Sequence, residues 1–207
     1  METLVTSLDW IPRETRSIFA RVLDGHELTV DEGIRLAEAE GRELHALALT
    51  ADEMRRRQVG DTVTYVVNRN INFTNVCIKH CTFCAFSRDH REEEGYLLPV
   101  EEVVRRAREA WEMGATEVCI QAGLPPKLPG SYYIDLTRAI KRAVPDLHLH
   151  AFSPEEILYG STRSGLPIQD YLKELKAAGL GTLPGTSAEI LNDEIRDVIS
   201  KGRITTR

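Results

Sequence analysis

The feature that most constrains the fold is a regular alternation of strand-like and helix-like segments that begins at about residue 61. Segments rich in β-branched and aromatic residues indicate strands, whereas apolar residues at helical spacing indicate helices. The expected strands are 64–73, 117–121, 147–152 and 180–183, and the expected helices are 100–113, 132–144, 168–178 and 188–199. Strands that alternate with helices favour a parallel sheet with right-handed crossovers. We therefore expect an α/β domain over residues 61–207.

Helix-start signals support these boundaries. Ser153, Pro154 and Glu156 have the spacing of a capping box with proline at the first helical position, and Thr186 and Glu189 repeat that spacing. About four βα units make half of an eight-stranded barrel, so we expect a partial (β/α) barrel that is C-terminally incomplete. Such an open barrel exposes sheet edges and apolar surface. An inactive fragment that keeps its metal-binding residues and lacks part of the residues that close over the substrate is therefore an alternative to an active enzyme.

Residues 1–60 lack strand-like alternation and predict helices. Thr29 and Glu32 have capping-box spacing, and Leu44, Leu47 and Ala51 recur at helical spacing in a segment that ends near residue 60. We interpret this region as an N-terminal helical extension that covers one end of the main domain. A lid or a partner-binding surface is the functional alternative.

Charge and hydropathy exclude several classes of protein. The 207 residues include 26 Lys and Arg against 32 Asp and Glu, a net charge of −6, whereas nucleic-acid binding needs a basic face. No apolar run approaches the roughly 20 residues that cross a bilayer, and charged residues interrupt the N-terminus where a signal peptide would be apolar. We expect a cytoplasmic protein with neither nucleic acid nor a membrane as a partner.

Three of the four cysteines lie within eight residues, at Cys77, Cys81 and Cys84, directly after the first expected strand. Active sites of parallel barrels lie at that carboxyl end of the strands. Three thiolates can hold three irons of a 4Fe–4S cluster and leave the fourth iron open to another ligand. A zinc site completed by His80 or His90, or a cluster that only transfers electrons, remains an alternative. Cys119 stands alone in an apolar segment and reads as a small core residue.

The CxxxCxxC spacing, with Phe83 before the third cysteine, resembles the signature of the radical S-adenosylmethionine (SAM) enzymes. The resemblance implies that Cys77, Cys81 and Cys84 hold a 4Fe–4S cluster and that SAM binds at its open iron. It further implies that an electron donor reduces the cluster, that SAM is cleaved to methionine and a 5′-deoxyadenosyl radical, and that Phe83 lies beside the adenine.

Wider motifs resemble one group of radical SAM enzymes, the 4-hydroxyphenyl transferases that form the second subunit of the deazaflavin chromophore (FO) synthases. The similar segments are 68–75, 84–88, 94–96, 148–155 and 183–190. The resemblance implies that L-tyrosine is cleaved between Cα and Cβ, that its hydroxybenzyl group joins 5-amino-6-(D-ribitylamino)uracil, and that a partner FO synthase subunit closes the ring. The alternatives are the menaquinone-pathway aminofutalosine and dehypoxanthine futalosine synthases, and a non-catalytic iron–sulfur or zinc module.

The resemblance also suggests roles for residues at the ends of the later strands. Gln121 and Gly123 follow the second strand, where these enzymes place a turn that meets the SAM amino group, although a plain turn is the simpler reading. His148 and His150 share one face of the third strand and are candidate substrate-binding or proton-transfer residues. The candidates for the SAM ribose and carboxylate, which are also ordinary helix-cap residues, are Ser153, Glu155, Thr186 and Glu189. Asn72, Thr74 and Asn75 are expected to orient the cysteine loop.

Overall fold

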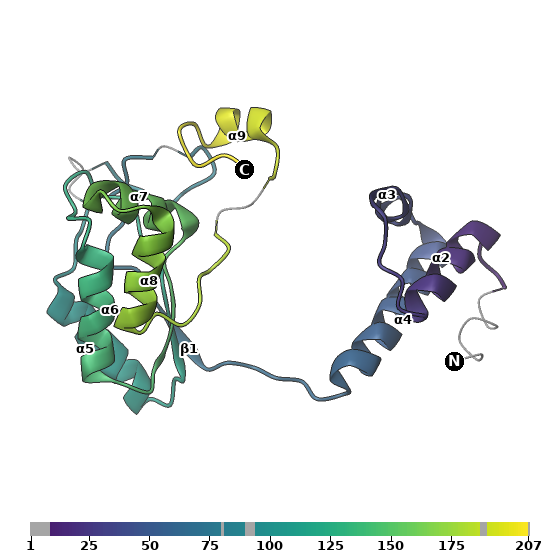
Figure 1. Ribbon diagram of the computed structural model, residues 1–207, viewed down its shortest axis with the longest axis horizontal. Coiled ribbons are helices and arrows are strands. Elements are labelled where there is room, and N and C mark those ends of the chain that lie inside the picture. Colours follow the sequence, from purple (N-terminus) through teal and green to yellow (C-terminus); the bar gives the residue numbers. More distant parts are fainter. Residues whose placement is uncertain (1–8, 80, 90–93, 187–189, 207) are drawn as a thin grey trace. The chain divides into compact units, whose positions relative to one another are not determined.

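The computed structural model describes residues 9–79, 81–89, 94–186 and 190–206, which form parts of two compact units. The first unit is Met1–Thr64 and the second is Tyr65–Arg207 (Figure 1). None of the helices in the described ranges is both long enough and apolar enough to span a membrane.

Helices make up the described part of the first unit, as the sequence predicts. They are α2 (Arg13–Leu23), α3 (Val30–Ala37) and α4 (Gly41–Val59). The capping box is present, because the Glu32 amide donates to Thr29 Oγ1 at 3.2 Å and the Thr29 amide donates to Glu32 Oε2 at 2.9 Å. Helix α4 ends at Val59, and the next residue, Gly60, has a φ of +67° that favours glycine.

The core of the first unit lies between α2 and α4, where Phe19, Val22 and Ala46 are buried. The buried face of α4 differs from the expected one, because Leu44 is 53% exposed while Ala46 and Thr50 are buried. Helical periodicity alone predicts the buried face of a helix only to within one residue, because small side chains such as alanine can pack in the core as well as leucine can.

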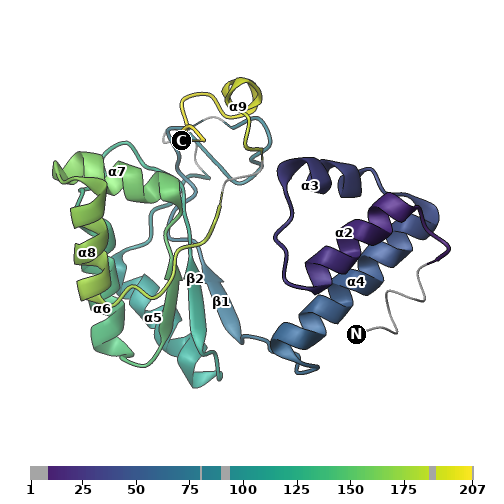
Figure 2. The ribbon, with the colours of Figure 1, turned by 45° about the vertical axis from the view of Figure 1, so that its right-hand side comes forward.

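The second unit contains a parallel three-stranded sheet in the order β1-β2-β3. The strands are β1 (Asn68–Ile71), β2 (Glu117–Ile120) and β3 (His148–Ala151). The helices are α5 (Val100–Glu112), α6 (Tyr132–Ala143), α7 (Pro154–Ser164), α8 (Ile168–Ala178) and α9 (Asp193–Ile199). Figure 2 shows α5, α6 and α8 together on one side of the sheet. Strands and helices alternate along this unit, so the predicted α/β class is confirmed.

The two faces of the sheet differ in polarity. Side chains that face the helices are buried, namely Ile71, Val118, Ile120, Leu149 and Ala151. The opposite face, called here the polar sheet face, carries Asn68, Asn70, Glu117, Cys119, His148 and His150. Register places Glu117 between Asn68 and His148, and Cys119 between Asn70 and His150. Cys119 is therefore half-buried on this face and is not the core residue that the sequence suggested.

All four expected strands are shorter than predicted, and the first and the fourth differ most. The first covers only 68–71, since Val63 and Tyr65 are 90% and 87% exposed and do not join the sheet. The fourth, 180–183, is reduced to a single bridge between His150 and Thr182. The amides of Gly181 and Thr182 both donate to the Leu149 carbonyl, and the Thr182 carbonyl accepts from the Ala151 amide, so the pairing with β3 involves a single residue and makes no longer ladder.

The last helix also begins later than expected. Asn192 caps α9 by accepting a hydrogen bond from the Ile195 amide at 3.1 Å. The capping role expected for Thr186 is therefore wrong for this helix, and its hydroxyl donates instead to Gln121. Glu189 lies outside the described residues.

Candidate cluster and cofactor site

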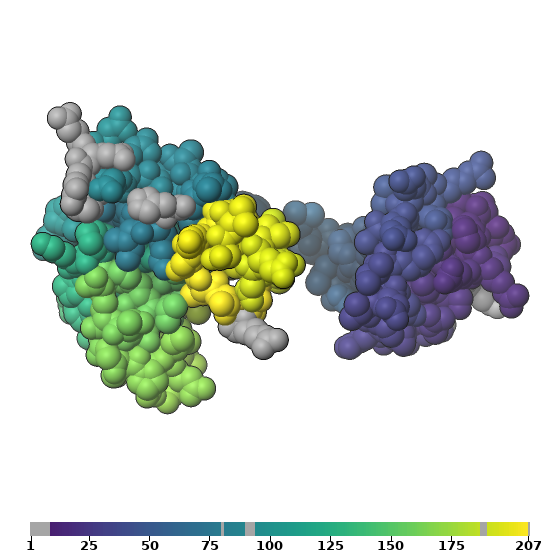
Figure 3. All heavy atoms as spheres, turned by 90° about the horizontal axis from the view of Figure 1, so that it is seen from above, coloured from purple at the N-terminus to yellow at the C-terminus, as the bar shows by residue number. Residues whose placement is uncertain are grey.

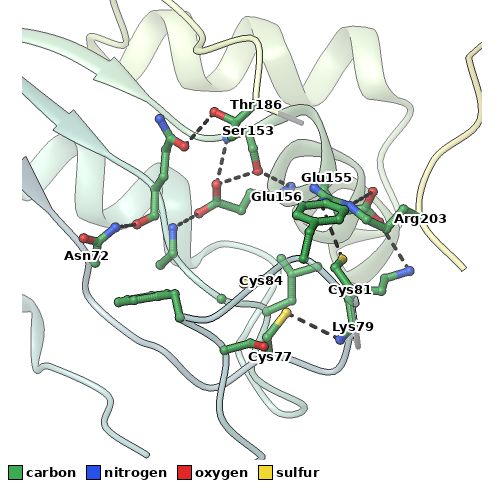
Figure 4. Close-up of a pocket in the computed structure, with 17 residues that line it drawn as sticks. Asn72, Cys77, Lys79, Cys81, Cys84, Ser153, Glu155, Glu156, Thr186 and Arg203 are labelled. Atoms are coloured by element: carbon green, nitrogen blue, oxygen red, sulfur yellow. Dashed lines mark hydrogen bonds and ion pairs between the residues drawn. The ribbon is translucent and has the colours of Figure 1, made fainter. Parts of the chain in front are cut away.

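A cavity of about 260 Å³ lies at the carboxyl end of the sheet, bounded by the loops after β1, β2 and β3 (Figure 4). The predicted site residues that line it are Cys77, Cys81, Phe83, Cys84, Gln121, Gly123, Ser153, Glu155 and Thr186. The carboxyl ends of parallel strands share one edge of a sheet, which explains how separate loops supply one site.

Side chains that follow β1 hold the cysteine loop in place. Buried Thr74 donates from its hydroxyl to the Tyr96 carbonyl at 2.6 Å and accepts from the Val76 amide at 3.1 Å. Asn75 donates to the Glu94 carbonyl at 2.9 Å, and its Oδ1 accepts from the Tyr96 amide at 2.9 Å. These bonds satisfy buried polar groups and orient the loop, as the sequence suggested for Thr74 and Asn75.

The turn after β2 is packed directly against the cysteine loop. The Gly123 amide donates to the Thr74 carbonyl at 3.0 Å, and the Ile78 amide donates to the Leu124 carbonyl at 2.9 Å. A Cβ atom at Gly123 would lie 2.2 Å from the Val76 carbonyl oxygen and 3.1 Å from Cys77 Cβ. Glycine is required here because two backbones approach closely, a reason that sequence reasoning did not identify.

Gln121 joins the turn to its surroundings. Its Oε1 accepts a hydrogen bond from Thr186 Oγ1 at 2.6 Å, and its carbonyl accepts from Asn72 Nδ2 at 2.5 Å. Its Nε2 donates to Cys119 Sγ at 3.3 Å. Gln121 therefore connects the rim of the site to the polar sheet face.

Glu156 is a buried carboxyl group that ties α7 to the turn after β2. Its Oε1 accepts from the Ala122 amide at 3.1 Å, and its Oε2 accepts from the Ser153 amide and hydroxyl at 2.7 Å each. Burial raises the pKa of Glu156 to about 7, against the hydrogen bonds from Ser153 and Ala122, which lower it. Sequence reasoning identified only its capping-box role, because the contact to Ala122 is tertiary.

A second buried carboxylate, Glu155, contacts two cations beside the cysteines. Its Oε1 lies 3.3 Å from Lys79 Nζ, and its Oε2 lies 3.6 Å from Arg203 Nε and accepts from the Ile204 amide at 2.9 Å. Arg203 Nη1 lies 3.6 Å from Cys81 Sγ. Burial raises the pKa of the Cys81 thiol, whereas the Arg203 guanidinium acts to lower it. Sequence reasoning missed Lys79 and Arg203, because no local pattern links them to Glu155.

His148 and His150 lie on the polar sheet face and do not line the cavity. Thr182 Oγ1 lies 2.9 Å from His148 Nε2 and 2.7 Å from His150 Nδ1. Glu117 Oε2 lies 3.7 Å from His148 Nε2, and Glu117 Oε1 accepts from Asn68 at 3.3 Å. The alternative zinc ligands His80 and His90 and the candidate SAM-binding residue Glu189 lie outside the described residues.

The donor set fits a 4Fe–4S cluster. Three thiols on one loop face a single cavity, and the Cys84 and Phe83 side chains are exposed toward it. Among the described residues no three His, Cys, Asp or Glu side chains surround one metal position. Such an arrangement is compatible with a cluster, because each cysteine of a 4Fe–4S cluster binds a different iron.

Fold and site together define an α/β protein with three cysteines around one cavity at the carboxyl ends of its parallel strands. Residues 71–207 match the Radical SAM superfamily, and the chain belongs to that superfamily. Membership implies a 4Fe–4S cluster and SAM as cofactors.

Two named relatives are similar to nearly the whole of this chain. The chain is 49% identical over 195 residues to the FO synthase of Streptomyces coelicolor, a match that covers 94% of this chain and 22% of that protein. It is 46% identical over 196 residues to the 5-amino-6-(D-ribitylamino)uracil–L-tyrosine 4-hydroxyphenyl transferase of Methanothermobacter thermautotrophicus, covering 95% of this chain and 53% of that protein. The chain therefore spans about half of the archaeal relative and about a fifth of the Streptomyces one.

Among solved structures, the fold resembles the FeFe-hydrogenase maturase HydG from Carboxydothermus hydrogenoformans. The TM-score is 0.66 at 22% identity, and the match covers 100% of this chain and 46% of that one. At this identity the likeness supports the fold alone.

Proposed function

We propose that the chain belongs to a radical SAM transferase that joins the 4-hydroxybenzyl group of L-tyrosine to 5-amino-6-(D-ribitylamino)uracil in FO biosynthesis. The observation that carries the proposal is the 46% identity, over 95% of the chain, to the archaeal 4-hydroxyphenyl transferase. The site supports it, because each described residue proposed for the cluster and SAM lines the same cavity. The same proposal includes an electron donor and a partner FO synthase subunit. It also includes a cytoplasmic location, because a reducing compartment keeps thiols free to bind metal.

The cysteine loop would hold the cluster through Cys77, Cys81 and Cys84. When bound, the cluster and SAM supply one-electron chemistry and a radical that removes hydrogen from a substrate. Phe83 is 47% exposed at the cavity and can cover the adenine with its ring. The protein's own task is to orient these groups and to exclude water.

Residues of the neighbouring loops would position SAM. Gln121, Ser153 and Thr186 present polar atoms to the cavity, while Gly123 brings the turn after β2 close to the cysteine loop. The hydroxyl of Thr186 donates a hydrogen bond to Gln121, and that of Ser153 donates one to Glu156. SAM binding at these hydroxyls would therefore exchange an internal hydrogen bond for one to the cofactor, a rearrangement with small net cost. Glu189 stays a sequence-based candidate.

The polar sheet face would receive the substrates. The ribityl-diaminouracil has many hydrogen-bonding groups, and this face offers amide, carboxylate and imidazole groups to match them. Thr182 links His148 and His150, and its hydroxyl has only one proton to donate. It can donate to one imidazole while it accepts from the other, which couples their tautomers and suits the pair to move a proton.

The test is an anaerobic assay with iron- and sulfide-reconstituted protein, a chemical reductant, SAM, tyrosine and the ribityl-diaminouracil. We expect tyrosine-dependent 5′-deoxyadenosine and a product of the mass of a hydroxybenzyl adduct. C81S should lose both signals together with bound iron, whereas C119S, the matched thiol control outside the cysteine loop, should keep the cluster. Formation of an adduct from an enolpyruvyl benzoate in place of tyrosine would contradict the proposal and favour a menaquinone-pathway synthase.

A further inference from the structure

The chain segment that follows α9 lies against the cysteine loop. The Thr82 amide donates to the Ile199 carbonyl at 2.8 Å, and the Thr82 hydroxyl contacts the same carbonyl at 3.2 Å. Lys79 Nζ donates to the Gly202 carbonyl. Figure 3 shows the C-terminal segment in yellow beside the teal region that contains the cysteines. Residues more than a hundred positions apart therefore share one small surface around the thiols.

Glu155 is the centre of this surface. The residue is 5% exposed, and a buried carboxylate needs compensating charge and hydrogen bonds. Lys79 and Arg203 supply the charge, with exposed side-chain fractions of 24% and 13%, and the Ile204 amide supplies a hydrogen bond. Two cations face one carboxylate, so this group of three charged side chains has a net positive charge beside the cysteines.

Arg203 is the member of this charged group that contacts a thiol. Its Nε faces Glu155 at 3.6 Å, and its Nη1 faces Cys81 Sγ at 3.6 Å. A guanidinium has five N–H donors in a rigid plane, so one side chain can contact a carboxylate on one edge and a sulfur on another. Glu155, Arg203 and Cys81 thus form a line of carboxylate, guanidinium and sulfur.

We propose that Arg203 is a positioning residue that Glu155 holds against Cys81, and that its charge raises the reduction potential of the cluster bound there. Reduction adds one negative charge to a cluster already ligated by three thiolates. A nearby cation and N–H donors to the cysteine sulfur stabilise the reduced state more than the oxidised one. The inference rests on the proposed assignment of Cys77, Cys81 and Cys84 as cluster ligands, and it does not depend on which substrates the enzyme uses.

The experiment measures the midpoint potential of the reconstituted cluster by redox titration monitored by electron paramagnetic resonance. Arg203→Gln removes the cation, so we expect a lower potential than in the wild type. Glu155→Gln keeps a side-chain oxygen beside Arg203 that can still hold the guanidinium in place, but it removes the anion that partly neutralises that cation, so we expect a higher potential. Lys201→Gln is the matched control, because it removes one positive charge from an exposed residue of the same segment and should leave the potential unchanged.

Shifts of opposite sign in the two variants, with no shift in K201Q, support the proposal. Equal potentials in all proteins, or shifts of the same sign in R203Q and E155Q, overturn it. If R203Q binds no cluster, R203K decides: a cluster of near wild-type potential supports the charge role, whereas loss of the cluster in R203K too overturns it in favour of a purely structural contact. A wild-type protein that binds no iron would instead refute the cysteine assignment, and with it the proposed function.

Discussion

At the scale of single residues, the site depends on one position where only glycine fits. Gly123 lacks the positive φ that usually explains a required glycine, and the reason for it is the 2.2 Å approach that a Cβ would make to the Val76 carbonyl oxygen. Backbone atoms cannot move aside as a flexible side-chain end can. Any side chain at this position must therefore displace the cysteine loop or the turn after β2.

We predict that Gly123→Ala lowers the free energy of unfolding by about 1–3 kcal/mol, the usual cost of overpacking, and reduces the iron bound per chain. Gly185→Ala is the matched control, because a Cβ there meets no atom of the described residues within 4 Å, and it should change stability by less than about 0.5 kcal/mol. Urea unfolding and iron analysis measure the two effects. Equal iron content in G123A and G185A would show that the loops separate without consequence for the cluster.

At the scale of elements, the residues at the start of α7 cap the helix and also contact the loop after β2. Ser153 and Glu156 form the capping box that the sequence predicts, and the same Glu156 carboxyl group accepts the Ala122 amide from the loop after β2. The strand β3 ends at Ala151, and the next residue, Phe152, has a φ of +67°, which is unusual for an aromatic residue. The chain turns sharply there and brings Ser153, Glu155 and Glu156 to the rim of the site.

Glu156 should make stability depend on pH. Its pKa is raised from 4.5 in the unfolded chain to about 7 in the folded protein, so the folded state binds more protons between these values. Its contribution to stability is therefore greatest below pH 4.5 and is lost as the pH rises to about 7. Relative to E156Q, which does not titrate, we expect the wild type to lose on the order of 3 kcal/mol between these limits.

Urea unfolding of both proteins at pH 5 and pH 8 measures this difference, and taking the difference cancels the titration of the remaining groups. A constant difference in unfolding free energy across this range would mean that Glu156 stays ionised in the folded protein. The hydrogen bonds from Ser153 and Ala122 would then lower the pKa of Glu156 by as much as burial raises it.

At the scale of the whole molecule, the chain consists of two compact units joined by an exposed extended segment. The first unit is Met1–Thr64, and Val63 and Tyr65 at the junction are 90% and 87% exposed. Exposed extended segments are the preferred sites of limited proteolysis. The helical unit and the α/β unit should therefore be separable by a single cut.

We predict that chymotrypsin under limiting conditions cleaves first after Tyr65 and leaves two resistant fragments. Mass spectrometry of an early time course identifies the cut. Tyr65→Thr removes the chymotrypsin site and should slow formation of these fragments. A first cut within α4 or within the β-sheet unit would contradict the division into two units.

Local sequence patterns were sufficient for most of the elements. The capping boxes at Thr29 and Ser153 lie where the sequence predicts them, and α8 has the predicted bounds, because caps and helical periodicity depend on residues within a few positions of one another. The strand ends were less predictable. A strand ends where its neighbour stops pairing, and the residues 180–183 show this, since only Thr182 bridges to β3.

The sequence by itself determined which thiols are the candidate ligands, because the three cysteines spaced as in CxxxCxxC lie close together without any tertiary information. Only the tertiary structure decided how that ligand set is held. Arg203 and Cys81 are 122 positions apart, and Glu156 and Ala122 are 34 apart. Contacts at such separations arise from the common edge of the parallel strands and leave no periodic or spacing signal in the chain, so they become visible only when the sheet brings the loops together.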